Sequence, residues 1–399
     1  MTGPLAGVRV VEITSVVLGP FAAQILGDLG AEVIKIEPHA GDTTRNIGPA
    51  RNPTMGSMFL GINRNKRSVV LDLKQPAGRA AALKLAAGAD VLLHNLRPGA
   101  AKRLGLSYDD VSAINPKIIY CATYGYRAAG PYAEHPAYDD IIQAKSAVPE
   151  LQRAAQGEPH YMPSVVADKT TALTVVYAIN AALFHRERSG EGQAIEVPMF
   201  ETMVAFIMPE HLFGQTFVPP MGSAGYVRVL SLHRKPQKTK DGYIAVLPHT
   251  DAHWRYFLGI AGRDDVLKDE RFKNVGLRTQ FIDDLYGQLA DIIAERTTAE
   301  WLELLDPAKL PLTALNTPDE LIDDPQLNAT GFWQESDHPS EGPIRMTDQP
   351  IGFSETPGTY RRHAPRLGEQ SIEVLREAGL EEAEIEAMLA DGVTVDGAA

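Results

Sequence analysis

Hydrophobic and polar positions along the first two hundred residues alternate between short apolar runs and segments of helical spacing. The apolar runs, several of them β-branched, cover 8–13, 31–36, 69–73, 90–93, 118–122 and 194–197. Between them, apolar residues recur at helical spacing in 19–30, 77–87 and 170–187. Strands that alternate with helices predict an α/β fold with a doubly wound parallel sheet, in which ligands bind at the carboxyl ends of the strands.

The length of 399 residues exceeds what one hydrophobic core ordinarily supports, and it predicts two domains. The stretch 214–242 is rich in glycine and proline and carries a basic run. Helical patterns follow around 254–261 and 281–294, and an amphipathic pair lies near 371–378 and 381–389. The change in composition therefore predicts a crossing into a second, smaller domain.

The overall charge and the cysteine content limit the kinds of partner and the cellular compartment that we expect for this protein. A net charge of −13 argues against nucleic acid, because phosphate backbones select basic surfaces. No apolar run approaches the length of about eighteen residues that a membrane span needs, and no secretory signal is evident at the start. The single cysteine, Cys121, excludes an internal disulfide and lies in a run typical of a buried strand. We therefore expect a cytoplasmic protein that binds neither nucleic acid nor a membrane.

Basic residues nevertheless gather in the segment 61–103, which contains only two carboxylates, Asp72 and Asp90. The cations of this segment are Arg64, Lys66, Arg67, Lys74, Arg79, Lys84, Arg97, Lys102 and Arg103. A local cluster of this kind can bind a small anionic ligand despite the negative total charge. It predicts a phosphate site, with an ordinary solvated surface as the alternative.

The first strand, turn and helix favour a dinucleotide site only superficially. Glu37 ends the second apolar run, where a ribose-binding acid would lie, but the closely spaced glycines of a G-x-G-x-x-G turn are missing. The zinc-hydrolase and serine-hydrolase signatures are also absent. His249 and His253 stand four residues apart without an intervening glutamate, and Trp254 indicates packing. The sequence therefore predicts neither NAD nor a metal.

Two segments carry carboxylates at the starts of expected helices, where they could take part in catalysis. Asp139 and Asp140 begin a helical pattern after a turn, and Asp168 follows a small apolar run just before the helix expected from Thr170. Each could serve simply as a helix cap. We expect a carboxylate at Asp168 to stay ionised beside the helix N-terminus, whose free N–H groups could also stabilise an oxyanion.

With these segments in place, the chain resembles the class III CoA-transferases, the CaiB/BaiF group that includes formyl-CoA, carnitinyl-CoA and bile-acid CoA-transferases. The resemblance runs through most of the chain. It is carried by 4–12, 29–37, 63–73, 95–99, 188–193 and 364–368, together with Gly130-Pro131, Tyr138-Asp139 and the Asp168 segment. So many ordered blocks do not arise by chance.

The resemblance implies an enzyme that moves CoA from an acyl-CoA thioester to a free carboxylic acid. In such enzymes the residue that matches Asp168 attacks the acyl-CoA carbonyl to form a mixed anhydride, and the released thiolate then gives an aspartyl-CoA thioester. Coenzyme A enters as the acyl-CoA substrate, and neither a metal nor NAD is implied. Nearby dipoles and the exclusion of water would have to stabilise these steps.

Matching positions also imply binding residues and a domain plan. The nucleotide end of CoA is expected near Leu71, Lys74, Asn95, Leu96, Arg97 and Arg103, and the thioester near Val17, Tyr138 and Asp139. A large Rossmann-like domain would comprise 1–205 together with 325–399. Between these two parts, the chain would form a linker at 206–224 and a small α/β domain at 225–324. The resemblance further implies a homodimer of two interlocked rings.

Departures from the family pattern bear on the substrate. Formyl-CoA enzymes carry a glutamine in the first loop, where this chain has Val16-Val17. Their glycine-rich lid has no counterpart around 240–262. Both differences favour an acyl group that is larger and less polar than formate or oxalate.

Alternatives to CoA transfer remain. The α-methylacyl-CoA racemases, a sister branch, have a His-Asp pair where this chain has Tyr138-Asp139, and a phenol is a poor base for the α-proton. His135 lies three residues out of register. A racemase or isomerase is therefore the second hypothesis for the function. A dinucleotide-binding oxidoreductase or a non-catalytic CoA-binding protein is the third.

Overall fold

The chain folds into two units, each with its own hydrophobic core. The computed structural model describes residues 3–398. Unit 1 takes in the chain up to Ser146, Ser164–Phe206 and the chain from Pro325 onward, and unit 2 consists of Ala147–Pro163 and Ile207–Asp324. Residues 147–163, which the sequence placed with the large domain, thus belong to unit 2. Among the helices of residues 3–398, none is both long and apolar enough to cross a membrane.

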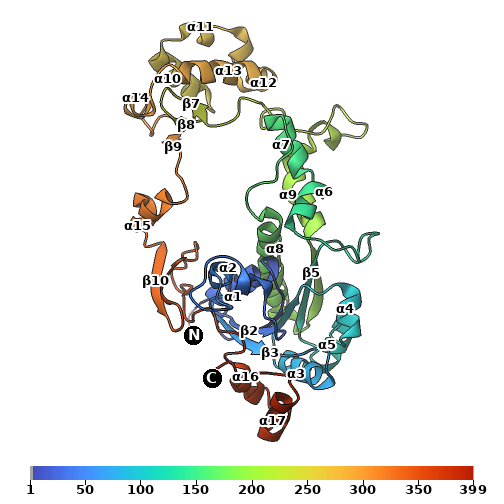
Figure 1. Cartoon of the computed structure of the whole chain (residues 1–399). Helices are drawn as coiled ribbons and strands as arrows, with labels where there is room; N and C mark the ends of the chain where they lie inside the picture. Colours follow the sequence, from blue (N-terminus) through green and yellow to red (C-terminus); the bar gives the residue numbers. More distant parts are fainter. Residues whose placement is uncertain (1–2, 399) are drawn as a thin grey trace. The chain divides into compact units, whose positions relative to one another are not determined.

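A six-stranded parallel sheet lies at the centre of unit 1 (Figure 1). Its strands are β1 (Arg9–Ile13), β2 (Glu32–Glu37), β3 (Lys66–Val70), β4 (Val91–His94), β5 (Ile119–Tyr124) and β6 (Gln193–Pro198). The order β3-β2-β1-β4-β5-β6 confirms the predicted α/β fold with a parallel sheet. Because the strand order reverses between β1 and β4, the carboxyl ends of these two strands form the topological switch point where such sheets bind ligands.

Helices cover both faces of this sheet (Figure 1). The helices of unit 1 are α1 (Leu18–Asp28), α2 (Ser57–Ile62), α3 (Pro76–Ala87), α4 (Pro98–Arg103), α5 (Tyr108–Ile114), α6 (Asp139–Lys145), α8 (Val166–Ser189), α16 (Ser371–Glu377) and α17 (Glu382–Ala390). A short α15 (Pro325–Ala329) lies beside β10 rather than on this sheet (Figure 1). Helices α1 and α8 pack on each other and contact the strands. Ala82, Val111, Val374 and Met388, from α3, α5, α16 and α17, share one buried cluster with strand residues such as Leu92. A hairpin of β10 (Trp333–His338) and β11 (Gly342–Thr347) completes unit 1.

Unit 2 is a smaller α/β unit. Its antiparallel sheet has the order β7-β8-β9, from Gln237–Lys238, Tyr243–Val246 and Leu312–Ala314. Its helices are α7 (Val148–Gln156), α10 (Asp251–Ala261), α11 (Asp264–Leu267), α12 (Val275–Gln280), α13 (Ile282–Ile293) and α14 (Thr298–Leu304). The part of α9 (Met199–His211) that follows Phe206 also belongs to unit 2, and the longer first part belongs to unit 1. Phe257, Leu289 and Trp301 lie at the centre of its core.

The third strand begins earlier than its apolar run predicts. The sequence favours 69–73, whereas β3 spans Lys66–Val70 with all five residues buried. Lys66 and Arg67 tolerate burial because each meets carboxylates: Lys66 Nζ lies 2.9 Å from Glu12, and Arg67 pairs with Glu32 and two glutamates of α16. A charge that is paired and hydrogen-bonded can occupy a strand position that its residue type disfavours.

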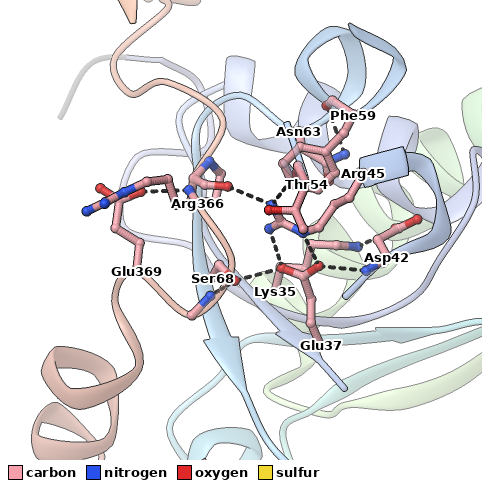
Figure 2. A network of polar contacts seen from close by, with 12 residues as sticks. Lys35, Glu37, Asp42, Arg45, Thr54, Phe59, Asn63, Ser68, Arg366 and Glu369 are labelled. Carbon is pink, nitrogen blue, oxygen red and sulfur yellow. Dashed lines mark hydrogen bonds and ion pairs between the residues drawn. The ribbon is translucent and has the colours of Figure 1, made fainter. Parts of the chain in front are cut away.

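Charged side chains form a buried network beside the sheet (Figure 2). The Arg45 guanidinium binds both oxygens of Glu37 at 2.7 and 2.8 Å, and Lys35 Nζ lies 3.0 Å from Glu12 and 3.1 Å from Asp42. Although burial alone would raise it, the pKa of Glu37 is held at about 2 by Arg45, Lys35 and Ser68. Glu37 is thus fully occupied within the fold, which removes it as a ribose-binding acid.

Candidate active site

A cavity of about 420 Å³ opens in unit 1 at the topological switch point. Its walls come from the loops after β1, β4 and β5, from the segment before α6, and from the starts of α8 and α9. The lining residues are Ser15, Val16, Leu18, Asn95, Leu96, Arg97, Ala100, Thr123, Tyr124, Gly125, His135, Pro136, Ala137, Tyr138, Asp168 and Met199. Strand topology, rather than proximity in sequence, brings these segments together.

Asp168 is a buried carboxylate in this cavity, with 7% of its surface exposed. Helix α8 begins at Val166, four residues earlier than predicted, so Asp168 lies in the first helical turn and the N-cap is Val165. The interpretation of Asp168 as an N-cap is therefore wrong. The chain bends at residues 163 and 164, directly before this early helix start.

Burial raises the pKa of Asp168 to about 7, and the neighbouring charge of Asp139 adds to the rise. Within residues 3–398, no hydrogen-bond donor to its carboxylate offsets these effects. A place at a helix N-terminus therefore does not keep the pKa of this group at its ordinary value. Desolvation and a like charge outweigh the helix dipole, which is weak by comparison with the loss of hydration.

Asp139 lies directly behind Asp168 and holds its backbone. The Asp168 N–H donates to Asp139 Oδ1 at 2.9 Å, and Gln143 Nε2 donates to Asp139 Oδ2 at 2.6 Å. Asp139 is buried in the first turn of α6, with Tyr138 as the N-cap. This arrangement fixes the start of α8 against α6 and leaves the Asp168 carboxylate facing the cavity.

The loop after β4 supplies another wall of the cavity. His94 ends β4 and is buried, and its Nδ1 accepts the Leu96 N–H at 3.2 Å. Burial lowers the pKa of His94 to about 4, so the imidazole is neutral and can accept this bond near neutral pH. Asn95 Nδ2 donates to the Ser15 carbonyl at 3.0 Å, and an Arg97 N–H donates to the Glu134 carbonyl at 3.1 Å. Side chains of the loop thus join the walls that follow β1 and β5.

The structure brings together only part of the residue set predicted from the sequence. Asp168, Asn95, Leu96, Arg97 and Tyr138 line the cavity. The remainder lie outside its lining: buried Val17 as the N-cap of α1, buried Leu71 in the core, exposed Lys74 after β3, exposed Arg103 at the end of α4, and buried Asp139 behind the start of α8.

Several lining residues had no clear signal in the sequence. Tyr124 ends β5 and donates to Glu196 at 2.7 Å, and Met199 follows β6. Polar residues that end parallel strands are a signal that could have identified Thr123 and Tyr124. His135, which is out of register with the racemase histidine, nevertheless lines the cavity that contains Asp168.

The basic segment divides into structural and exposed cations. Arg64 binds Asp28 through two hydrogen bonds at 2.7 and 2.9 Å, and Lys66 and Arg67 are used within the fold as described above. Arg97 and Arg103 of the same segment remain exposed. A count of cations along the sequence therefore overstates the charge available to a phosphate.

Other candidate sites offer less chemistry. Burial raises the pKa of Cys121 to about 12, which leaves an inert thiol in β5, as predicted. No group of three or more metal-binding side chains gathers in the part of the chain that the structure describes. A larger cavity of about 690 Å³ lies in unit 2, between segments around Phe213, Leu230 and Ile282. Its one carboxylate, Asp283, accepts a hydrogen bond from Ser231 at 2.6 Å and is therefore already paired.

The family assignment follows from comparison with known proteins. The model of the family described as CoA-transferase family III matches residues 5–371, which is nearly the whole chain. The chain belongs to CoA-transferase family III. The predicted resemblance is thereby confirmed, and the protein is an enzyme of this family.

Two relatives and one solved structure match this chain over nearly its whole length and over most of their own. A succinyl-CoA:glutarate CoA-transferase of Mus musculus is 33% identical over 98% of this chain and 90% of its own. A succinate–glutarate CoA-transferase of Agrobacterium fabrum is 32% identical over 94% of this chain and 95% of its own. A CAIB/BAIF family protein from Brucella suis has a similar structure, with a TM-score of 0.80 and 30% identity, covering 95% of this chain and 100% of its own.

Proposed function

We propose that this family III enzyme transfers CoA from an acyl-CoA to a free carboxylic acid through covalent intermediates on Asp168. The observation that carries the proposal is a buried carboxylate to which no side chain or backbone group of residues 3–398 donates a hydrogen bond, facing a cavity at the switch point of the sheet. Removal from water destabilises the carboxylate relative to the neutral ester-like adduct. That difference favours attack by a group that is a weak nucleophile in water.

Four steps complete the exchange. A carboxylate oxygen of Asp168 attacks the thioester carbonyl, the C–S bond breaks, and a mixed anhydride forms with release of CoA thiolate. The thiolate attacks the aspartyl carbonyl, which yields an aspartyl-CoA thioester and the free donor acid. The acceptor carboxylate attacks this thioester to form a second mixed anhydride and thiolate. Finally the thiolate attacks the acceptor's acyl carbonyl, which gives the new acyl-CoA and restores Asp168. No step consumes a proton, so no general acid is required.

We propose a dicarboxylic acid as the acceptor and a short acyl-CoA such as succinyl-CoA as the donor. Two relatives that cover nearly the whole chain carry succinate and glutarate in their names. Val16 lines the cavity, and apolar Leu18 and Met199 lie in the same lining, which supports an aliphatic acyl chain rather than formate or oxalate. The lining also contains the basic side chains of Arg97 and His135, and these could attract the second carboxylate of the substrate.

The remaining expectations complete the proposal. CoA would extend from the cavity along Asn95, Leu96 and Arg97, with its nucleotide end near Leu71, Lys74 and Arg103. Two copies would assemble as an interlocked dimer in the cytoplasm. Leu173, Tyr177 and Phe184 of α8 support a covered face, because they are 55%, 65% and 64% exposed and recur at helical spacing. Light scattering during size-exclusion chromatography tests the dimer.

The decisive experiment combines an acceptor panel with detection of the adduct. Carboxylic acids of different length are offered with succinyl-CoA as donor, and the fastest acceptor defines the substrate class. Enzyme mixed with succinyl-CoA alone should carry a hydroxylamine-sensitive adduct on the tryptic peptide 154–169, which contains Asp168. Transfer activity without any adduct on this peptide would contradict the proposed route.

Racemisation is a second candidate, because His135 and Asp168 line one cavity and could face the two sides of an α-carbon. Incubation of a 2-methylacyl-CoA in deuterated water, followed by NMR, reports exchange of the α-proton. We expect negligible exchange. Rapid exchange that disappears in His135→Ala would establish the racemase instead.

A further inference from the structure

The loop between β1 and α1 contains a backbone conformation that its residue type disfavours. Val16 has φ = 73°, in the left-handed region. A β-branched side chain is strained there, because its Cβ crowds the backbone. Gly occupies this region freely, yet the chain has valine at a position that lines the cavity of Asp168. Strain of this kind persists only where the surroundings impose it, and it concentrates at functional sites.

Three side chains impose this conformation by holding two successive peptides, one between Thr14 and Ser15 and one between Ser15 and Val16. Lys35 Nζ donates to the Thr14 carbonyl at 2.8 Å, Asn95 Nδ2 donates to the Ser15 carbonyl at 3.0 Å, and the Val16 N–H donates to Asp42 Oδ1 at 3.2 Å. The loop has no room to relax toward α1. The Thr14 side chain packs directly on the backbone of Gly19, because a Cβ on Gly19 would lie 2.3 Å from Thr14 Cβ.

Asp42 is itself held from behind the cavity. Its Oδ1 also accepts the Thr44 N–H and hydroxyl at 2.9 and 2.8 Å, and its Oδ2 lies 3.1 Å from Lys35 Nζ. Figure 2 shows Asp42 beside Lys35 and Glu37, whose Oε2 accepts the Asp42 N–H at 2.9 Å. Asp42 and Lys35 are 1% and 0% exposed and do not line the cavity. Their contact with the cavity is therefore made through the loop that they hold.

We propose that Asp42 is a positioning residue for CoA transfer. Held by Lys35, it keeps the Val16 peptide in the left-handed conformation, so that Ser15, Val16 and Leu18 form one fixed wall of the cavity that contains Asp168. A wall that cannot yield confines the acyl thioester to one orientation and sets which acyl groups fit. This inference goes beyond the proposed route, since any acyl exchange in this cavity needs the same wall, whichever group carries the acyl intermediate.

Val16→Gly is the sharpest test, because glycine accepts φ = 73° without strain and therefore need not unfold the protein. Overall transfer is measured with succinyl-CoA and the fastest acceptor of the panel. We expect kcat to fall about ten- to a hundredfold and the preference among acyl-CoA chain lengths to flatten. Thr54→Gly is the matched control: Thr54 has φ = 65° and lies outside the cavity lining, so its kinetics should equal those of the wild type.

Asp42→Asn tests the other end of the same linkage. An amide has one oxygen and cannot serve both the Lys35 ammonium and the three donors at Oδ1. We expect a lower Tm, together with the loss of kcat and of chain-length selectivity seen in Val16→Gly. Asp28→Asn, which disturbs the buried Arg64–Asp28 pair on the far end of α1, should lower Tm without changing selectivity.

The outcomes separate positioning from plain stability. A Val16→Gly enzyme with the kcat and selectivity of the wild type would overturn the proposal, as would an Asp42→Asn enzyme whose kinetics match Asp28→Asn. If Asp42→Asn fails to fold, Val16→Gly still decides. Because total transfer is the readout, these results stand even if no adduct is found on Asp168.

Discussion

Glu37 and Asp168 are two carboxylates of unit 1 that are almost equally buried, with 1% and 7% of their surfaces exposed. Arg45 and Ser68 donate to Glu37, and its pKa is held at about 2 despite burial. Asp168 has no such donor among the described residues, and burial together with Asp139 raises its pKa to about 7. Burial therefore does not decide the state of a carboxylate. The donors around it do, and the carboxylate that lacks them is the one available for chemistry.

Asp168→Asn should give the largest difference between the two sites. Loss of the nucleophile is expected to lower kcat by about a thousandfold or more and to abolish the adduct on peptide 154–169. Stability near pH 8 should rise, on the order of 2–4 kcal/mol at most, because a buried unpaired charge is removed. Steady-state kinetics and urea unfolding measure the two effects. Asp140→Asn, a change at the exposed neighbouring acid of α6, should alter neither, and an active Asp168→Asn enzyme would end the comparison.

Glu37→Gln should show the opposite combination. It leaves the Arg45 guanidinium buried without its counter-charge, so we expect a loss of about 3–5 kcal/mol in the free energy of unfolding. The protein that remains folded should turn over at the wild-type rate, because Glu37 does not line the cavity. Glu373→Gln, at a glutamate 54% exposed that pairs with Arg67, should cost less than about 1 kcal/mol. Equal losses in the two variants would show that the buried network is not specially stabilising.

The pH dependence of activity follows from the raised pKa of Asp168. Only the carboxylate attacks, so kcat/KM for acyl-CoA should rise about tenfold per pH unit below a pKa of about 7 and level off above it. Rates measured from pH 5 to 9 on the enzyme with and without Asp140→Asn check this. A profile that is flat across pH 6–8 would contradict the role of Asp168 in the free enzyme.

The pH dependence of stability should have opposite signs at the two carboxylates. For Asp168, the folded pKa of about 7 exceeds the ordinary 3.8, so its contribution to stability is full below about 4 and is lost as the pH rises through 7. For Glu37, the folded pKa of about 2 is below the ordinary 4.5, so its contribution is present above about 4.5 and is lost as the pH falls toward 2. Urea unfolding of Asp168→Asn should lack the first dependence and keep the second.

A double replacement, Arg97→Ala with Arg103→Ala, gives the smallest expected effect. Both side chains are exposed and would meet CoA phosphates, so KM for acyl-CoA should increase about tenfold at low salt, with a smaller increase at higher salt, because salt screens the attraction that the wild type uses. Lys102→Ala, an exposed cation on the same helix, is the matched control and should leave KM unchanged. An unchanged KM in the double variant would show that Arg97 and Arg103 do not bind CoA. The phosphates of CoA would then have to bind elsewhere.

The sequence by itself determined the α/β architecture and the family. Apolar runs such as 31–36 and 118–122 mark buried strands because burial on both faces demands near-continuous hydrophobicity. Ordered motifs identified the CoA-transferase family, and through it Asp168, as the candidate nucleophile. Boundaries were less secure: Lys66 and Arg67 lie outside the apolar run 69–73, yet their partners in other elements hold them in β3.

Only the tertiary structure decided the chemical state of the candidate residues. Which cations of 61–103 stay available depends on pairs such as Arg64–Asp28, whose members are 36 positions apart in the chain. The same holds for Val16, which lines the cavity while its neighbour Val17 is buried as a helix cap. Local sequence sets propensity and periodicity, but solvation and charge depend on distant neighbours, and these together fix the pKa of Asp168.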